Sequence, residues 1–204
     1  MKETIFNIGY DLITKEIPGG SRVLDLGCGD GELLAELKRK KRIEGFGIEI
    51  SPESVGIALS KGVFACQADI DEGLSDYKDN SFDYVILNQT IQNTKRPEYV
   101  LREIMRIGTR VIISFPNFSH ILIRMNLFFR GKMPKTKSLP YEWYDTPNIH
   151  MLSIKDFRTF CRQKGFSIEK EINFNTNINN STSSKKIVFP NLFAMYGLFV
   201  LKKD

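Results

Sequence analysis

Cysteine and histidine are scarce in this sequence, which limits the kinds of site it can build. The 204 residues include three cysteines, Cys28, Cys66 and Cys161, and two histidines, His120 and His150. The cysteines form no CxxC pair, and the histidines lie far apart. This spacing argues against a disulfide framework and against a zinc centre, so we predict no metal site. A reduced, cytoplasmic protein is the expectation.

Long apolar runs and a strong charge of one sign are also missing. No stretch approaches the roughly 18 apolar residues that span a bilayer, and MKETIFNIGYDLITKEIPGG lacks the uninterrupted apolar run of a signal peptide. The formal net charge is +5, much of it in KRKKR at Lys38–Arg42. We interpret this cluster as the solvated last turn of a helix, with nucleic-acid contact as the alternative. We expect no nucleic acid and no membrane among the partners.

Strand and helix patterns alternate over the first 116 residues. Apolar runs predict strands at 22–27, 44–50, 63–70, 82–88 and 110–116. Amphipathic patterns predict helices at 4–17, 32–41, 51–62 and 96–108, and the residues expected to face the sheet are Ile5, Ile8, Leu12, Ile13, Leu33, Leu34, Leu37, Val100, Leu101, Ile104 and Met105. Repeated units of this kind predict an α/β, doubly wound, mostly parallel sheet with helices on both faces. The length fits a single domain over residues 1–204.

The alternation breaks after residue 116. Residues 117–152 form a long insert, followed by a predicted helix at 153–165 whose Ser153 and Asp156 make an S-x-x-D capping box. Two final strands are predicted at 166–175 and 192–203. The polar segment 175–186 between them is expected to be a solvated connection.

The strongest motif is VLDLGCGDGELL, in which a strand enters Gly27, Gly29 and Gly31 and a helix opens near Glu32. Glycines allow the sharp turn and a close approach of a ligand to the backbone, and we expect amide N–H groups and the positive helix end to point at that ligand. The third glycine stands one position too early for a G-x-G-x-x-G fingerprint, and no G-K-[ST] follows. The motif therefore favours neither a dinucleotide nor a nucleoside triphosphate.

Carboxylates around and beyond the turn favour a ligand with cationic groups. The three nearest are Asp25, Asp30 and Glu32. Glu49, at the end of the second predicted strand, can accept hydrogen bonds from both hydroxyls of a ribose. Asp69, at the tip of the third, can receive an adenine amine.

The segments VLDLGCGDG, IEI and ADI, followed by DNSFDYVILNQTIQN, resemble class I S-adenosylmethionine-dependent methyltransferases over residues 20–116. The resemblance implies seven strands in the order 3-2-1-4-5-7-6, with the seventh antiparallel, and S-adenosylmethionine or S-adenosylhomocysteine as ligand. It places Gly27 and Gly29 beside the methionine moiety and Asp25 near its ammonium group. It assigns Glu49 to the ribose. The other residues expected at the cofactor are Asp69 and Ile70 at the adenine, and Asp30, Gly31, Ile50 and Asn88.

Methyl transfer from a sulfonium requires chiefly that donor and acceptor be aligned, so a general base is needed only for a protonated acceptor. The polar residues expected at the carboxyl edge of the sheet are Asn88, Gln89, Thr90, Gln92, Asn117 and His120. Of these His120 is the strongest base, and a surface or capping histidine is the alternative interpretation. The segment NQTI stands where methylases of exocyclic base amines carry N/D-P-P-Y/F, which argues against that subclass.

Longer strings are similar to the MetW family of methionine biosynthesis proteins over most of residues 20–170. They are QTIQN, SFPNFSH and RGKMPKTKSLPYEWYDTPNIHMLSIKDF. The resemblance implies a soluble bacterial protein that acts as partner or activator of homoserine O-acyltransferase. The alternative is a methyltransferase acting on a small molecule, with His120, Tyr141 and Gln89 as candidate catalytic residues. Whether the protein is an enzyme stays open.

The segment LPYEWYDTPNIH at 139–150 has three possible roles. Tyr141, Trp143, Tyr144 and His150 have amphipathic side chains that suit a lid over the sheet edge, a docking surface, or a loop that packs its aromatic residues on its own domain. The apolar stretch ILIRMNLFFRGK at 121–132 raises membrane contact as a further idea, which its short length disfavours.

Overall fold

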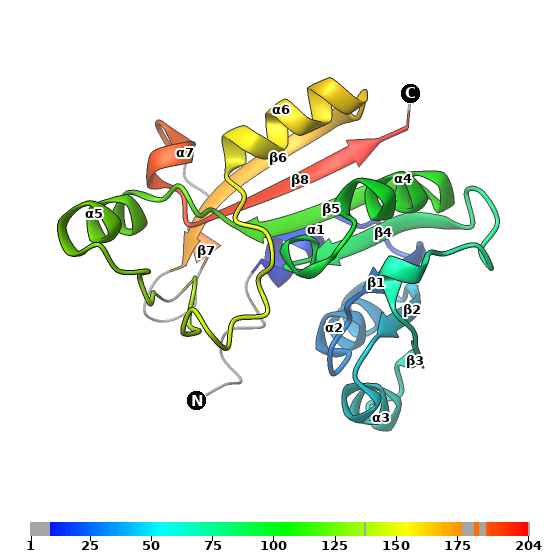
Figure 1. The fold of residues 1–204 in the computed structure, drawn as a ribbon. Coiled ribbons are helices and arrows are strands. Elements are labelled where there is room, and N and C mark those ends of the chain that lie inside the picture. Colours follow the sequence, from blue (N-terminus) through cyan, green and yellow to red (C-terminus); the bar gives the residue numbers. More distant parts are fainter. Residues whose placement is uncertain (1–8, 137, 177–181, 184–186, 204) are drawn as a thin grey trace.

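A mixed β-sheet runs through the described part of the chain, which comprises residues 9–136, 138–176, 182–183 and 187–203 of a computed structural model (Figure 1). The strands are β1 (Arg22–Leu26), β2 (Glu44–Glu49), β3 (Phe64–Gln67), β4 (Phe82–Asn88), β5 (Gly108–Pro116), β6 (Ser167–Thr176), β7 (Thr182–Ser183) and β8 (Tyr196–Lys202). The helices are α1 (Tyr10–Glu16), α2 (Glu32–Lys41), α3 (Pro52–Ser60), α4 (Pro97–Ile107), α5 (Ile121–Arg130), α6 (Ile154–Lys164) and α7 (Pro190–Phe193), with short 3-10 turns η1 (Ile70–Glu72) and η2 (Ile91–Asn93).

The strand order is β3-β2-β1-β4-β5-β8-β6-β7. β1 to β5 are parallel, and β8 lies antiparallel between β5 and β6. This confirms the doubly wound sheet and its order of seven strands, in which β8 is the seventh. The two-residue β7, which pairs with the end of β6, was not predicted and lies within the segment expected to be a connection.

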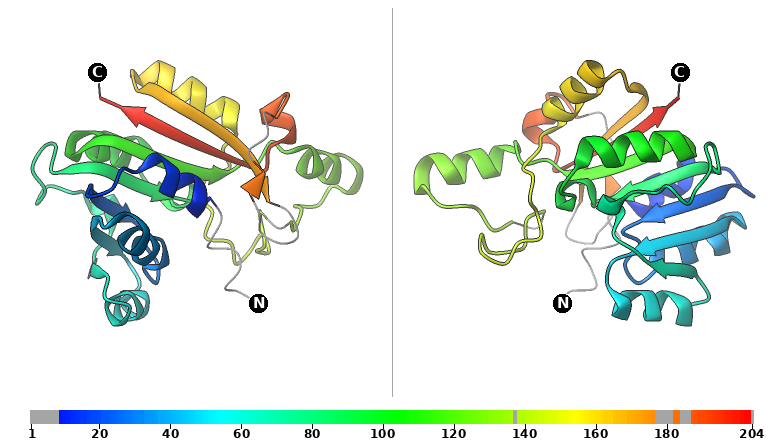
Figure 2. Two further views of the ribbon diagram at one scale, coloured as in Figure 1. Left: turned by 180° about the vertical axis from the view of Figure 1, so that it is seen from behind. Right: turned by 45° about the vertical axis from the view of Figure 1, so that its right-hand side comes forward.

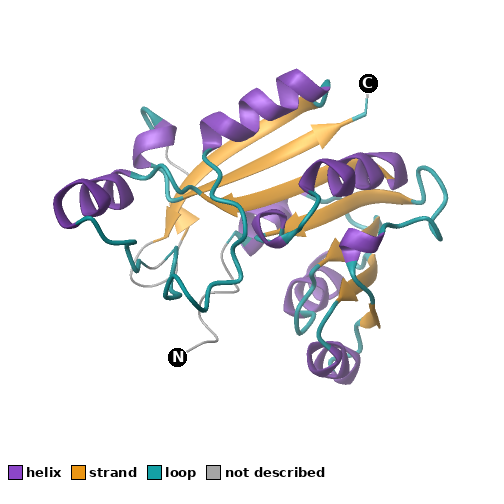
Figure 3. Cartoon of the chain, viewed as in Figure 1, coloured by secondary structure: helices purple, strands orange, loops and turns teal. Residues whose placement is uncertain are grey.

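Helices cover both faces of the sheet (Figures 2 and 3). Alternate residues of a strand point to opposite faces, so Val23 packs with α1, α2 and α3, whereas Leu24 packs in the core that includes α4 and α6. The predicted inward residues that the structure describes are all buried: Leu12, Ile13, Leu33, Leu34, Leu37, Val100, Leu101, Ile104 and Met105. Ile5 and Ile8 lie outside the described residues.

Most helix boundaries follow the predicted signals. The first helix, predicted over 4–17, begins at Tyr10, because Gly9 before it has a left-handed backbone with φ of 84°. The Ser51 hydroxyl accepts a hydrogen bond from the Ser54 amide, and Pro52 is the first residue of α3. Ser153 and Asp156 form the capping box at the start of α6. Lys38–Arg42 form the end of α2, as expected for a solvated helix terminus, and the Lys40 ammonium lies 2.6 Å from the Glu36 carboxylate.

Two strand boundaries were predicted wrongly. The third strand ends at Gln67, because the Asp69 carboxylate accepts a hydrogen bond from the Asp71 amide and turns the chain into η1. The last strand begins at Tyr196 instead of residue 192, because Pro190 starts the short helix α7. Asp69 and Ile70 consequently lie in a turn beyond β3.

Among its described residues the insert contains one helix, α5, which extends away from the sheet beside α7 (Figures 1 and 2). The described residues of the insert beyond α5 form turns and bends without helix or strand. Among the described residues, none of the helices is long and apolar enough to cross a membrane. The same residues contain no cluster of three or more metal-binding side chains.

Candidate functional site

The loop between β1 and α2 is fastened to the end of β2. The amides of Gly27 and Cys28 donate to the Ile48 carbonyl at 2.8 and 3.1 Å, and the Gly29 amide donates to Glu49 Oε2 at 2.9 Å. These amides therefore hold the turn in place, whereas the sequence predicted that they point at a ligand. The turn is a rigid part of the sheet edge.

Two glycines of the loop differ in what surrounds them. Gly27 has φ of 73°, and a Cβ placed there would come within 2.7 Å of the Thr90 side chain, which follows β4. Gly29 has φ of 55°, and a Cβ placed there would meet no atom of the described residues within 4 Å. Gly27 therefore allows close packing inside the protein, and Gly29 leaves open space above the turn where a ligand can touch backbone.

Gly31 and Asp30 complete the turn and join it to α3. A Cβ at Gly31 would lie 2.9 Å from the Ala58 Cβ, so this glycine permits α3 to pack on the loop. Asp30 forms an ion pair with Lys61, with Nζ and Oδ2 2.5 Å apart. The charge of Asp30 is thus compensated by the protein itself.

Asp25 carries an unmet hydrogen-bonding capacity. Its side chain is 3% exposed, and Oδ1 has no hydrogen-bond partner among the described residues. Burial, with a further contribution from the Glu49 carboxylate, raises the pKa of the Asp25 carboxyl to about 7. A buried acceptor of this kind is costly unless a donor or a positive charge completes it. It fits a ligand that brings an ammonium group to the turn.

Glu49 ends β2 and bridges two segments of backbone. Oε2 accepts from the Gly29 amide, and Oε1 accepts from the Ser51 amide at 3.0 Å. Each carboxylate oxygen can accept a further hydrogen bond, so both retain capacity for hydroxyl donors of a ligand. Ile50, the next residue, is 62% exposed and offers an apolar surface beside this carboxylate.

Asp69 and Ile70 lie at the turn beyond β3. Asp69 Oδ1 accepts from the Asp71 amide at 2.9 Å, and Ile70 is partly buried against the core on the α4 side. Asp71, which sequence reasoning missed, is the anchor of this turn, because its carboxylate accepts from the amides of Lys95 and Arg96 at 2.8 and 2.9 Å.

The segment after β4 is tightly constrained. The Asn88 amide oxygen accepts a hydrogen bond from the Ser114 hydroxyl on β5. Gln89 has φ of 54°, a left-handed conformation that is uncommon for residues other than glycine. The Gln92 side chain, 4% exposed, donates to the Gln89 carbonyl at 2.6 Å, and its own Oε1 has no partner among the described residues.

The same segment holds the far end of the insert. The Gln92 carbonyl accepts hydrogen bonds from the amides of Ile149 and His150 at 2.8 and 3.0 Å. Thr90, two residues earlier, is the side chain that would meet a Cβ at Gly27. A continuous set of contacts therefore joins the glycine turn to residues 149–150.

The aromatic residues of 139–150 face solvent. Trp143 is 75% exposed, Tyr144 is 71% exposed and Tyr141 is 41% exposed. The rings of Trp143 and Tyr144 meet edge to face, while Glu142 pairs with Lys135 at 3.0 Å. This exposure disfavours the interpretation that the loop packs these side chains on its own domain.

His120 and Asn117 serve the structure of the insert. His120 caps α5, with Nδ1 accepting from the Leu122 amide at 3.3 Å, and burial lowers the pKa of its imidazole. The buried Asn117 amide donates to the Ala194 carbonyl at 2.8 Å and to the Asn191 carbonyl at 3.1 Å. The geometry of His120 therefore agrees with a capping histidine, the alternative that the sequence left open.

Tyr10 is a residue near the turn that sequence reasoning missed. It is 8% exposed at the start of α1. Burial first, and then the charges of Asp25, Glu32 and Asp30, raise the pKa of its phenol. The amphipathic period of the first helix could have shown that Tyr10 is buried, but only the tertiary structure shows it close to these acids.

Comparison with known proteins gives a consistent set of similarities. The family model described as "Methionine biosynthesis protein MetW" matches residues 8–201. A bifunctional methionine biosynthesis protein MetXA/MetW of Rhodopirellula baltica is 35% identical over 175 residues, covering 81% of this chain and 28% of that protein. This chain therefore matches little more than a quarter of that relative. An uncharacterized protein of Methanocaldococcus jannaschii is 26% identical over 167 residues, 80% of this chain and 73% of that protein.

Solved structures share the fold at lower identity. A SAM-dependent methyltransferase of Thermotoga maritima, described as a possible histamine N-methyltransferase, aligns with a TM-score of 0.71 and 20% identity over 98% of this chain and 91% of its own. An S-adenosylmethionine-dependent methyltransferase of Mesorhizobium loti aligns with a TM-score of 0.69 and 16% identity over 96% and 97%. At these identities the likeness shows the methyltransferase fold alone.

Proposed function

The chain belongs to the MetW family of methionine biosynthesis proteins, and from this premise we propose that it binds S-adenosylmethionine or S-adenosylhomocysteine at the β1–α2 turn. The observation that carries the proposal is the buried Oδ1 of Asp25, which has no partner in the described part of the chain, beside the open space at Gly29. S-adenosylmethionine has an ammonium group, a sulfonium and a ribose, which match an acid-lined turn. The fold shared with methyltransferases supports the same ligand.

Each residue has a role set by its chemistry. Asp25 accepts from the ligand ammonium group, and Gly29 leaves room for the methionine moiety. Glu49 accepts from the two ribose hydroxyls. The adenine lies between Ile50 and the turn at Asp69 and Ile70. Gly27, Asp30, Gly31 and Asn88 hold the surrounding backbone in place.

We further propose that the protein assists or regulates homoserine O-acyltransferase. The family resemblance implies this partner, and a relative that joins MetXA and MetW in one polypeptide supports it. The site also favours an accessory role, because His120 caps a helix and the polar side chains at 88–94, after β4, are amides and hydroxyls. Amides are poor general bases.

A methyltransferase acting on a small molecule is the second candidate. The methyltransferase fold favours it, and transfer to an unprotonated acceptor needs alignment more than a base. When bound, S-adenosylmethionine supplies an electrophilic methyl group. Gln89, Tyr141 and His120 stay the candidates for orienting an acceptor.

Calorimetry on the wild type and three variants tests whether S-adenosylmethionine binds at the β1–α2 turn. We expect S-adenosylmethionine to bind the full chain and Glu49→Ala to weaken binding at least tenfold, since hydrogen bonds to a charged group contribute about 1.5–3 kcal/mol. Glu44→Ala, at the opposite end of the same strand, is the matched control and should bind normally. Gly29→Ala should abolish binding, and it should cost about 1–2 kcal/mol of unfolding free energy because the backbone there is left-handed. Undetectable binding to the wild type at millimolar ligand refutes the cofactor assignment.

An acyltransferase assay tests the accessory role separately. The rate of homoserine O-acylation by the purified acyltransferase is measured with and without this protein. We expect the rate to change on addition, and to change further with S-adenosylmethionine. If the rate is unaffected and no complex forms, the accessory role fails while the ligand assignment stands on its own measurement.

A further inference from the structure

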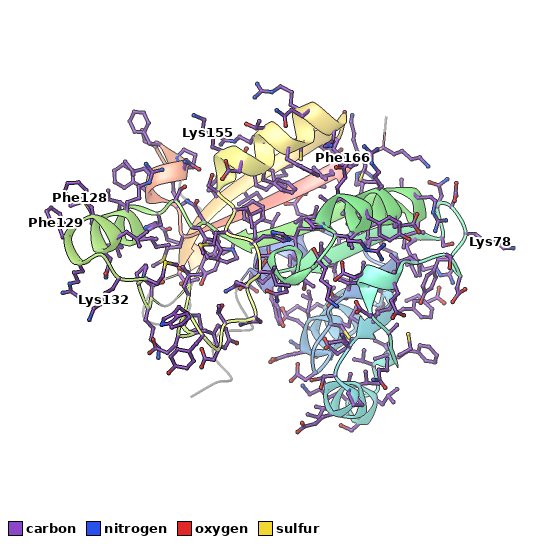
Figure 4. All side chains as sticks on the ribbon, in the orientation of Figure 1. Lys78, Phe128, Phe129, Lys132, Lys155 and Phe166 are labelled. Carbon is purple, nitrogen blue, oxygen red and sulfur yellow. The ribbon has the colours of Figure 1, made fainter. Side chains whose placement is uncertain are left out.

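Helix α5 exposes a stripe of three apolar side chains on one face, and Leu127, elsewhere on the helix, is also 42% exposed. Leu122, Met125 and Phe129, at positions i, i+3 and i+7, are 56%, 42% and 69% exposed. Phe128 beside them is 81% exposed, and Figure 4 shows both phenylalanines at the outer end of the molecule. Only Ile123 of this helix is buried. Soluble proteins seldom expose such a cluster unless it meets a partner.

The surroundings of α5 extend this apolar surface and keep it in place. Asn117, just before the helix, is hydrogen-bonded to the carbonyls of α7 and of Ala194, so the start of α5 is held beside α7. Phe189 and Phe193 there are 72% and 44% exposed. The buried hydrogen bonds of Asn117 therefore fix the start of α5 at the end of the sheet. We call the exposed face of α5 with these two residues the apolar arm.

Unpaired cations border the apolar arm. The sequence has no Asp or Glu from residue 117 to residue 141. Arg130 and Lys132 are exposed, and within the described part of the chain neither forms an ion pair. A surface that fits the arm is therefore an apolar groove with carboxylates at its edge.

We propose that α5 is the docking helix by which this protein binds homoserine O-acyltransferase, entering an apolar groove edged by carboxylates on that enzyme. The inference rests on the proposed function for the identity of the partner. Spacing of i, i+3 and i+7 is that of helices that lay one face into a protein groove. Aromatic and methionine side chains are enriched at protein interfaces. In the same insert Glu142 compensates the charge of Lys135, and Asp145 adds a further carboxylate, which disfavours an anionic lipid surface.

Binding measurements on purified full-length proteins test the docking helix. The double variant Phe128→Ser/Phe129→Ser should weaken the complex with the acyltransferase at least thirtyfold, as loss of central aromatic anchors does. Phe64→Ser, on β3, removes an aromatic residue of comparable exposure, 63%, and should change the dissociation constant less than twofold.

Charge reversal tests the border of the arm. Lys132→Glu should lower the association rate about tenfold at low salt, and the difference should shrink at high salt. Lys78→Glu is the matched control, because Lys78 lies on a distant loop (Figure 4). Its association rate should stay close to that of the wild type.

The outcomes separate the docking helix from the partner. A complex that forms equally well with the double phenylalanine variant overturns the docking helix and leaves the accessory function intact. Absence of any complex with the wild type removes the accessory function and the docking helix together. Binding to phosphatidylglycerol vesicles that depends on Phe128 and Phe129, or a dimer of this chain that the double variant dissociates, overturns the proposal in favour of that occupant.

Discussion

The β1–α2 turn and the apolar arm both contain groups without a partner in the described part of the chain. At the turn this group is polar and buried, and on the arm these groups are apolar or cationic and exposed. At the turn, backbone amides are bonded and the charge of Asp30 is compensated, and one buried carboxylate oxygen of Asp25 lacks a donor among the described residues. On the arm, backbone groups are bonded within α5, whereas apolar side chains and cations face solvent. A buried polar atom that lacks a hydrogen-bond partner indicates a site for a small ligand of matching charge. A cluster of exposed apolar side chains indicates a surface that binds another macromolecule.

Replacement of Asp25 by asparagine should have the largest effect on stability. The pKa of the Asp25 carboxyl rises from 3.8 to about 7 on folding. Between these values the folded chain keeps a proton that the unfolded chain has lost, so wild-type stability falls as pH rises from about 4 to 7, by roughly 4 kcal/mol. Asparagine does not ionise, so the stability of Asp25→Asn should not fall over this pH range. Urea unfolding at several pH values should show an advantage of the variant that grows toward pH 7.

An advantage of Asp25→Asn that is the same at pH 4 and pH 7 would contradict that explanation. The same variant should lose S-adenosylmethionine binding. The substitution therefore separates the effect of Asp25 on stability from its role in binding the ligand. In the wild type, binding should tighten as pH rises through about 7, because the ligand ammonium group requires the ionised carboxylate.

Gly27→Ala should cost about 3 kcal/mol of unfolding free energy. The left-handed backbone at φ of 73° disfavours any Cβ by about 1–2 kcal/mol, and overlap with Thr90 adds a similar amount. Gly56→Ala is the control, because Gly56 lies in α3 with nothing within 4 Å of an added Cβ. It should raise stability slightly through helix propensity. Chemical unfolding of the two variants in parallel gives the comparison.

Gln89→Gly should raise stability by roughly 0.5 kcal/mol. Glycine relieves the left-handed conformation at φ of 54°, and its greater backbone entropy offsets part of that gain. The backbone bonds to Ser114 and Gln92 are kept. Gln89→Ala keeps the conformational cost and should bring no gain in thermal unfolding. A gain with alanine as large as that with glycine would argue that the side chain itself is strained.

Phe129→Ser on the arm should leave the free energy of unfolding within about 0.5 kcal/mol of wild type, because an exposed side chain contributes little to the core. Chemical unfolding measures this directly. A loss of unfolding free energy comparable to that of Gly27→Ala would show that Phe129 packs on the rest of the protein. The apolar arm would then no longer differ from the β1–α2 turn as a surface left open to a partner.

The sequence was sufficient for the parts of the fold that depend on local periodicity. Apolar runs and capping residues such as Ser51 and Ser153 placed the strands and helices, and strand–helix repetition predicted the parallel sheet. Boundaries failed at Asp69 and Pro190, where a side-chain cap and a short helix turn the chain. Local signals of this kind are weaker than periodicity over several turns.

The sequence by itself determined the glycine turn with its acids, because these follow from residue types at fixed spacing, and its resemblance to known families implied the family and the order of the strands. Only the tertiary structure decided which groups are satisfied. It places Lys61 on Asp30, leaves Asp25 Oδ1 without a partner among the residues it describes, and brings the amides of Ile149 and His150 to Gln92. It also turns the phenylalanines of α5 toward solvent. Burial and pairing depend on contacts between residues far apart in the chain, which spacing alone does not encode.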